Sequence, residues 1–144
     1  MSINDKTLAV MKAINQALAT RGWCLVRGGI GVGKTSAIRE ALHQTGWEAL
    51  WKGWPALEAQ ETRTQLSTEA KECLVLDGLV DEWAPGETQT SNPSWTAFYA
   101  ATTVAMDRAK LGLLTIVCVA VQEEQGEIHP DLESLPGCVV VTLR

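Results

Sequence analysis

The sequence has few of the residues that build metal centres. Its 144 residues include two histidines, His43 and His129, and four cysteines, no two of which form a C-x-x-C pair. The cysteines are Cys24, Cys73, Cys118 and Cys138. All four fall in apolar segments that we expect to be buried strands, which favours reduced core residues. A metal site built from these residue types is therefore not expected.

Long apolar runs and an excess of positive charge are also missing. No apolar run reaches the length of a membrane span, and no charged-then-apolar leader is present at the N-terminus. A cytoplasmic protein is therefore expected. The net charge of −5 argues against a protein that coats nucleic acid through a broadly basic surface. It does not exclude a local basic groove, or a ring-shaped oligomer whose inner rim is basic. No repeats interrupt the chain, so residues 1–144 predict a single domain.

What the sequence does contain is a glycine-rich segment, RGGIGVGKTS, at 27–36. It fits the pattern G-x-x-x-x-G-K-[ST], the Walker A motif, without a mismatch. In such a loop the backbone curls so that successive N–H groups point at phosphate oxygens, and glycine tolerates the positive φ that this requires. The expected phosphate-binding residues are Gly28, Gly29, Ile30, Gly31, Val32, Gly33, Lys34, Thr35 and Ser36. Lys34 would reach the β- and γ-phosphates, and Thr35 would ligate Mg²⁺.

The flanking segments support this interpretation. The apolar stretch 23–27 predicts a buried strand before the loop, and 35–46 predicts a helix that ends at Gly46. Strand, loop and helix in this order resemble the P-loop NTPase superfamily. The resemblance implies ATP and Mg²⁺ as ligands.

Elsewhere the chain alternates helical and strand-like segments. Residues 1–21 predict an amphipathic helix with Leu8, Met11, Ile14 and Leu18 on one face. The other expected elements are strands at 49–51, 73–76, 113–121 and 138–143, one or two helices within 55–72, a helix at 95–110 capped by Ser94, and polar loops at 84–94 and 122–131. This order predicts an α/β, three-layer P-loop NTPase fold with a central, mostly parallel sheet of about five strands. Its site would lie at the carboxyl ends of the strands.

The segment CLVLD, which ends in Asp77, is a Walker-B candidate. Asp77 would hold the Mg²⁺ shell together with Thr35, or else it merely ends a strand and caps a turn. Hydrolases of the additional-strand class usually carry a glutamate after this aspartate, whereas Gly78 follows it here. We favour Glu82 as the water-activating base. Asp81 and Glu58 are the other candidates.

The segment MDRAKLGLLTIVCVAVQ resembles the FtsK–HerA group of DNA pumps, in which R-x-x-G precedes a strand that ends in Gln. A P-x-L stretch before the last strand would correspond to HPDLESLPG. By this resemblance Gln122 would sense the γ-phosphate through the attacking water, and Arg108 would act as an arginine finger at a neighbouring subunit's site. The alternatives are a polar strand end for Gln122 and a solvated helix residue for Arg108.

Three functions follow from these patterns. The favoured one is an oligomeric, Mg-dependent ATPase in DNA transfer, packaging or mobile-element maintenance, with a homo-oligomer or a partner protein and DNA as possible partners. The second is a nucleotide-gated regulatory subunit with slow hydrolysis. A small kinase is less favoured, because neither polar loop carries the arginines of a lid that would close over the phosphate. A GTPase is also disfavoured, because the sequence contains no N-K-x-D motif for recognising guanine. No helical lid follows the last strand, so a full AAA+ module is not expected.

Overall fold

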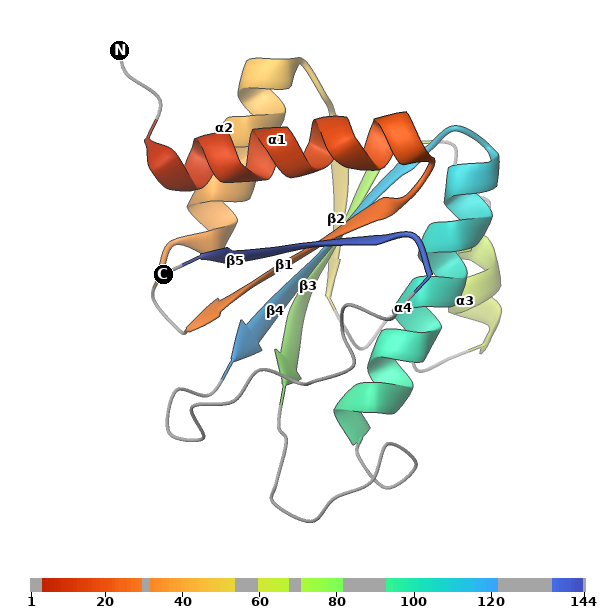
Figure 1. Ribbon diagram of the computed structural model, residues 1–144. Coiled ribbons are helices and arrows are strands. Elements are labelled where there is room, and N and C mark those ends of the chain that lie inside the picture. Colours follow the sequence, from red (N-terminus) through yellow and green to blue (C-terminus); the bar gives the residue numbers. More distant parts are fainter. Residues whose placement is uncertain are drawn as a thin grey trace.

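The computed structural model describes residues 4–29, 32–53, 60–67, 71–81, 93–121 and 136–143. Helices and strands alternate along this part of the chain (Figure 1). The helices are α1 (Asp5–Thr20), α2 (Lys34–Thr45), α3 (Gln60–Ser67) and α4 (Pro93–Lys110). The strands are β1 (Trp23–Gly29), β2 (Ala49–Gly53), β3 (Cys73–Asp81), β4 (Leu114–Val121) and β5 (Cys138–Leu143).

The strands form one parallel sheet in the order β2-β3-β4-β1-β5. Strand β1 pairs with β4 over Cys24–Gly29 and with β5 over Trp23–Gly28, so Val26 lies beside Cys118 on one side and Val141 on the other. Because all strands are parallel, β1, β3 and β4 end at the same edge of the sheet (Figure 1). The prediction of a parallel, five-stranded α/β fold is confirmed.

Two hydrophobic cores lie on opposite faces of the sheet. On one face the strands pack against α3 and α4, and Trp23 and Leu25 of β1 lie in that core. On the other face they pack against α1 and α2, and Cys24 and Val26 of β1 lie there. This division follows from the strand period, which sends successive side chains to opposite faces. The result is the predicted three-layer arrangement, with α1 lying across the sheet (Figure 1).

Helix α1 buries only part of the face that we predicted, because Ile14 is buried and Met11 packs against the core as expected, whereas Leu8 and Leu18 do not. Its buried residues are Thr7, Val10, Ala13, Ile14 and Ala17. Leu8 and Leu18 are 41% and 40% exposed, so the prediction was wrong for both. Helix α1 packs closely against α2 and the sheet, and this close packing favours the small side chains Thr7, Ala13 and Ala17 on its buried face.

Two element boundaries also differ from the predictions. Helix α4 begins at Pro93, a residue suited to a first helical turn, so Ser94 lies inside the helix and is not its N-cap. Strand β3 continues to Asp81 instead of ending before Asp77. The second difference bears directly on the candidate site. In the described part of the chain, no helix has the length and apolar character needed to cross a membrane.

The cysteines occupy the interior, as expected. Cys24, Cys73 and Cys118 are buried and Cys138 is half-buried, and no disulfide joins any of these four residues. Burial raises the pKa of Cys73 and of Cys118 from 9.0 to about 12. Burial also raises the pKa of Cys24, and the neighbouring thiols Cys73 and Cys138 raise it further.

These raised pKa values predict that alkaline pH destabilises the fold. Above pH 9 the unfolded chain loses thiol protons that the folded chain keeps, so the folded state binds more protons and the free energy of unfolding falls as pH rises from about 9 to about 12. Each such thiol contributes a slope of about 1.4 kcal/mol per pH unit. Urea unfolding in reducing buffer at pH 8 and pH 10 measures the slope. The Cys73→Ala variant is expected to show a flatter one, and an unchanged slope would contradict the prediction.

Candidate functional site

The glycine-rich loop connects β1 to α2 at the carboxyl edge of the sheet. Gly33 is the N-cap of α2 and has φ 93° and ψ 26°, the left-handed conformation that favours glycine. The helix begins at Lys34, as predicted, so its N-terminal dipole faces the loop. Ile30 and Gly31 lie outside the described residues, and their part in phosphate binding stays a prediction.

Gly28 shows how tightly the start of the loop is packed. A Cβ atom placed there would lie 2.7 Å from the carbonyl oxygen of Leu143 in β5 and 2.8 Å from Cγ1 of Val32. Since neither distance leaves room for a side chain, glycine is required for a steric reason. The end of the loop therefore packs against its start, because the side chain of Val32 lies against the backbone of Gly28.

Lys34 points back across the loop. Its Nζ donates to the carbonyl oxygens of Gly28 at 2.9 Å and Gly29 at 2.8 Å. Thr35 is half-buried in the same helical turn, whereas Ser36 is exposed. The ammonium group is thus held over the loop, close to the backbone that is expected to bind phosphate.

Asp77 lies at an irregularity inside β3. Leu76 pairs with Val117 and Leu79 pairs with Val119, so Asp77 and Gly78 together face the single residue Cys118. This is the two-against-one pattern of a β-bulge, a feature that often re-aims side chains beside functional sites. The prediction that the strand ends before Asp77 was wrong, because the bulge lets pairing resume and continue to Asp81.

Gly78 provides the backbone conformation of this bulge. Its φ is 91°, a value that side-chain-bearing residues rarely adopt. Its N–H donates to Oδ1 of Asp77 at 2.8 Å, which fixes the carboxylate beside its own backbone. The position after Asp77 is therefore poorly suited to the glutamate that additional-strand hydrolases usually carry there.

Cys118 connects the two halves of the site. Burial is the main cause that raises its pKa to about 12, the Asp77 carboxylate raises it further by charge and by a side-chain hydrogen bond, and the Lys34 ammonium opposes the rise. Asp77 and Lys34 thus both affect the pKa of the thiol that lies opposite the bulge. Sequence reasoning treated Cys118 only as core, because the residue opposite the bulge depends on register, which the sequence does not show.

Arg108 does not reach this edge of the sheet. Its side chain is 0% exposed and lies at the opposite end of α4, where β4 begins. The guanidinium donates to Thr115 Oγ1 at 3.0 Å and to the carbonyl oxygens of Lys71 at 2.8 Å and Leu114 at 3.2 Å. A finger must project from the surface into a neighbouring subunit's site, so this position contradicts the arginine-finger prediction for Arg108. The alternative of a solvated helix residue was wrong for the same reason.

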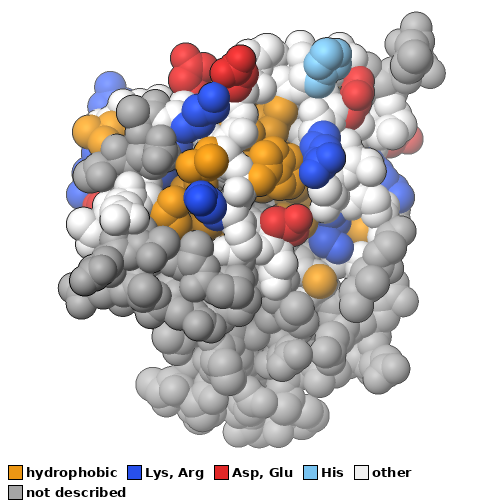
Figure 2. Space-filling view, turned by 180° about the vertical axis from the view of Figure 1, so that it is seen from behind, with side chains coloured by type: hydrophobic (Ala, Val, Ile, Leu, Met, Phe, Trp, Pro, Cys, Tyr) orange, Lys and Arg blue, Asp and Glu red, His pale blue; other side chains and the backbone are white. Residues whose placement is uncertain are grey.

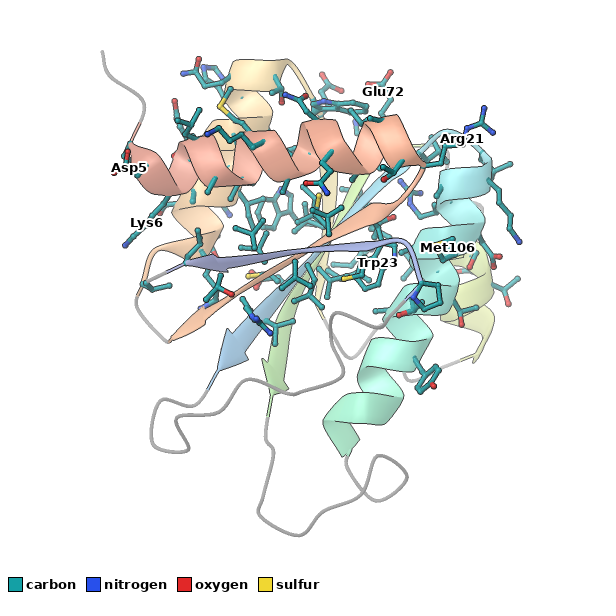
Figure 3. All side chains as sticks on the ribbon, in the orientation of Figure 1. Asp5, Lys6, Arg21, Trp23, Glu72 and Met106 are labelled. Atoms are coloured by element: carbon teal, nitrogen blue, oxygen red, sulfur yellow. The ribbon has the colours of Figure 1, made fainter. Side chains whose placement is uncertain are left out.

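Lys6 of α1 is a contact of the loop that sequence reasoning missed. Its Nζ donates to the carbonyl oxygen of Val32 at 2.6 Å, across 26 residues of sequence. Figure 3 shows Lys6 extending from the first turn of α1 toward the end of α2 at which the loop enters. No motif marks this lysine, because the contact depends on how α1 lies across the sheet.

The remaining candidate residues lie outside the described part of the chain. These are Glu82 and Glu58, the candidate bases, and Gln122, the candidate γ-phosphate sensor. For Asp81 the backbone at the end of β3 is described. Their roles stay predictions.

The donors present fit a magnesium nucleotide. Asp77 provides a carboxylate and Thr35 a hydroxyl, which are hard oxygen ligands of the kind Mg²⁺ uses together with phosphates and water. Among the described residues, no cluster of three or more histidine, cysteine or acidic side chains could hold a metal by itself. Asp77 and Thr35 would therefore hold Mg²⁺ together with phosphate oxygens and water.

Comparison with solved structures identifies the fold. Domain III of the replication initiation protein DnaA from Thermotoga maritima superposes with a TM-score of 0.55 at 14% identity, over 100% of this chain and 65% of that one. AMPPCP-bound DnaA from Aquifex aeolicus matches with a TM-score of 0.55 at 14% identity, over 100% of this chain and 48% of that one. A DnaA structure bound to AMPPCP and single-stranded DNA matches with a TM-score of 0.53 at 13% identity and the same coverage.

These matches show that the chain has the same α/β fold as the DnaA structures. The chain spans about half the length of the two DnaA structures that contain AMPPCP, with 48% of each covered, and 65% of DnaA domain III. No family model matches the sequence. No curated protein matches it either.

Proposed function

We propose that this protein is a P-loop ATPase that binds Mg-ATP at residues 28–36. The observation that carries the proposal is the meeting of three groups at one edge of the sheet. Lys34 lies over the loop and the N-terminus of α2 faces it. Asp77 raises the pKa of the Cys118 thiol, and Lys34 lowers it. A helix N-terminus, a lysine and a carboxylate are the groups that a magnesium nucleotide requires.

Each group has a separate task in this proposal. The N–H groups of the loop and of the first turn of α2 bind phosphate oxygens, and the Lys34 ammonium leaves the loop carbonyls to neutralise the β- and γ-phosphates. Thr35 and Asp77 hold the magnesium ion, which neutralises charge that develops on the phosphates during transfer. The strand order supports an additional-strand ATPase, because β4 lies between the loop strand β1 and the Asp77 strand β3.

Hydrolysis needs a base that activates water. We retain Glu82 as the proposed base and Gln122 as the proposed γ-phosphate sensor, since β3 and β4 end at the same edge as the loop and both residues directly follow these strands. No role at a neighbouring subunit is proposed for Arg108.

Gly78 favours a second candidate function, a nucleotide-gated regulatory subunit with slow hydrolysis. Its positive φ of 91° disfavours a glutamate at the position where fast additional-strand hydrolases carry one. In this alternative the bound nucleotide controls a partner protein. Slow hydrolysis then only returns this protein to the conformation it has without ATP.

For the wider role we propose an oligomeric ATPase that acts on DNA in transfer, packaging or mobile-element maintenance. The neighbour whose structure contains AMPPCP and single-stranded DNA supports nucleotide-dependent DNA binding as the first property to test. On the face shown in Figure 2, however, lysines and arginines alternate with acidic side chains around a hydrophobic patch. Among the described residues, that face therefore offers no continuous basic surface.

The decisive experiment for the function is steady-state ATP hydrolysis by the purified protein, alone and with single- or double-stranded DNA. Turnover that either DNA stimulates would support the DNA-dependent ATPase. Tight ATP binding with a turnover that neither DNA changes would favour the regulatory subunit. Transfer of the γ-phosphate to a metabolite rather than to water would instead establish the kinase alternative.

Substitution of Asp77 separates metal binding from phosphate binding. The Asp77→Asn variant is expected to lose at least about 100-fold in turnover, because one ligand of the magnesium shell loses its charge. Its affinity for ATP measured in EDTA is expected to match that of the wild-type protein, since the loop and Lys34 are unchanged. Comparable magnesium-dependent turnover in the variant would rule out Asp77 as the Walker-B residue.

A further inference from the structure

The contact between α1 and the loop fixes one peptide group of the proposed nucleotide site. Lys6 Nζ lies 2.6 Å from the carbonyl oxygen of Val32, a short charge-assisted hydrogen bond. The carbonyl belongs to the peptide that joins Val32 to Gly33. In a trans peptide the C=O and N–H bonds point in opposite directions, so a donor that holds the carbonyl also sets the direction of the Gly33 N–H.

Val32 is held from its other sides as well. Its N–H donates to the carbonyl oxygen of Gly29 at 3.3 Å, and its side chain lies against Gly28 and the core beneath α1 and α2. The residue is thus anchored through its amide, its side chain and, by Lys6, its carbonyl. Only the last of these anchors acts on the peptide that leads to Gly33.

The carbonyl oxygen of Gly33 accepts from Ala37 N–H at 3.0 Å, a bond that acts on the peptide after Gly33 and not on the one before it. Little else fixes the peptide before Gly33. Gly33 has no side chain, no atom lies within 4 Å of the position its Cβ would occupy, and α2 has no side-chain N-cap bond at this residue. Glycine also moves easily between backbone conformations. Without the Lys6 bond, the peptide before Gly33 would be free to rotate, and its N–H would point at phosphate only part of the time.

We propose that Lys6 is a positioning residue of the nucleotide site, which orients the Gly33 N–H toward the bound phosphates by holding the carbonyl of Val32. The proposal rests on the proposed ATP-binding function. It assigns a binding role to the first turn of α1, the helix that precedes β1 and the Walker A loop. It also makes the docking of α1 on α2 a determinant of nucleotide affinity.

The test compares Lys6→Met with Lys6→Arg and with Lys12→Met, a matched control on an exposed position of the same helix. Lys6→Met is expected to bind ATP about tenfold more weakly, the loss expected for one charged hydrogen bond. Lys6→Arg keeps a cationic donor and is expected to bind within about threefold of the wild-type protein. Lys12→Met is expected to bind as the wild-type protein does.

The Gly33 amide resonance in ¹⁵N-labelled protein provides the readout that separates positioning from a general structural effect. In the absence of nucleotide, Lys6→Met is expected to shift this resonance and to increase its fast motion, whereas Lys12→Met leaves both unchanged. The thermal unfolding midpoint of each variant checks that it is folded at the temperature of the measurement. If Lys6→Met does not fold, Lys6→Gln takes its place in the same comparison.

Three outcomes are distinguishable. Unchanged affinity and an unchanged Gly33 resonance in Lys6→Met would overturn the proposal. Weaker ATP binding with an unchanged Gly33 resonance would overturn it too, because Lys6 would then contact the nucleotide directly. If the wild-type protein does not bind ATP, the proposed function fails, and the nucleotide-free comparison of Gly33 still decides whether Lys6 orients this peptide.

Discussion

Replacing Lys34 with methionine is expected to weaken Mg-ATP binding by at least about 100-fold and to reduce turnover to background. Nζ of Lys34 makes two hydrogen bonds to the loop, to Gly28 and Gly29, and these donors would turn to the β- and γ-phosphates. Each charge-assisted hydrogen bond contributes about 1.5–3 kcal/mol, so the loss of two corresponds to a factor of about 100 or more. Methionine keeps much of the length of the side chain but has no positive charge.

Two measurements check this prediction. Equilibrium binding of ATP gives the affinity, and release of inorganic phosphate gives the turnover. Lys12→Met removes a lysine from the exposed face of α1 and is expected to leave both quantities unchanged. If Lys34→Met bound Mg-ATP as tightly as the wild-type protein, the phosphates would have to lie elsewhere than at this loop.

Replacing Arg108 with methionine is expected to lower the free energy of unfolding by about 3 kcal/mol. The side chain is fully buried, and its guanidinium bonds Thr115 and the carbonyl oxygens of Lys71 and Leu114. These bonds join the end of α4 to the starts of β3 and β4. Methionine fills part of the space but leaves the buried acceptors without their donor, and unsatisfied buried acceptors are costly.

Urea unfolding measures this loss of stability, and Lys110→Met, at an exposed position of the same helix, serves as the control. The control is expected to change the free energy of unfolding by less than about 0.5 kcal/mol. ATP affinity per folded molecule is expected to be unchanged in Arg108→Met, because the residue lies at the edge of the sheet opposite the loop. A variant of normal stability that has lost only its turnover would restore the finger role.

The sequence predicted the elements that depend on local patterns. The start of α2 at Lys34 and the helix stop at Gly46 follow from glycine positions and helical spacing, and both are observed. The strands follow from short apolar runs between polar segments. Their order β2-β3-β4-β1-β5 agrees with the parallel sheet that alternating strands and helices predict.

The features that the sequence did not predict depend on how the elements pack. The bulge at Asp77 and Gly78 exists because of the register between β3 and β4, which sets Cys118 opposite them. The contact of Lys6 with Val32 and the burial of Arg108 depend on helix positions. An arginine near a helix end has the same sequence pattern whether it projects outward or is buried, so the pattern alone did not separate the two roles.

The central claim is that the loop at 28–36 binds a magnesium nucleotide with the help of Asp77. Calorimetric titration of ATP into the wild-type protein, first with Mg²⁺ and then with EDTA, tests it most directly. We predict saturable binding of one ATP per chain that magnesium strengthens, with the magnesium effect lost in Asp77→Asn and binding lost in Lys34→Met. Heat changes that do not saturate, or binding that all three proteins share equally, would contradict the claim.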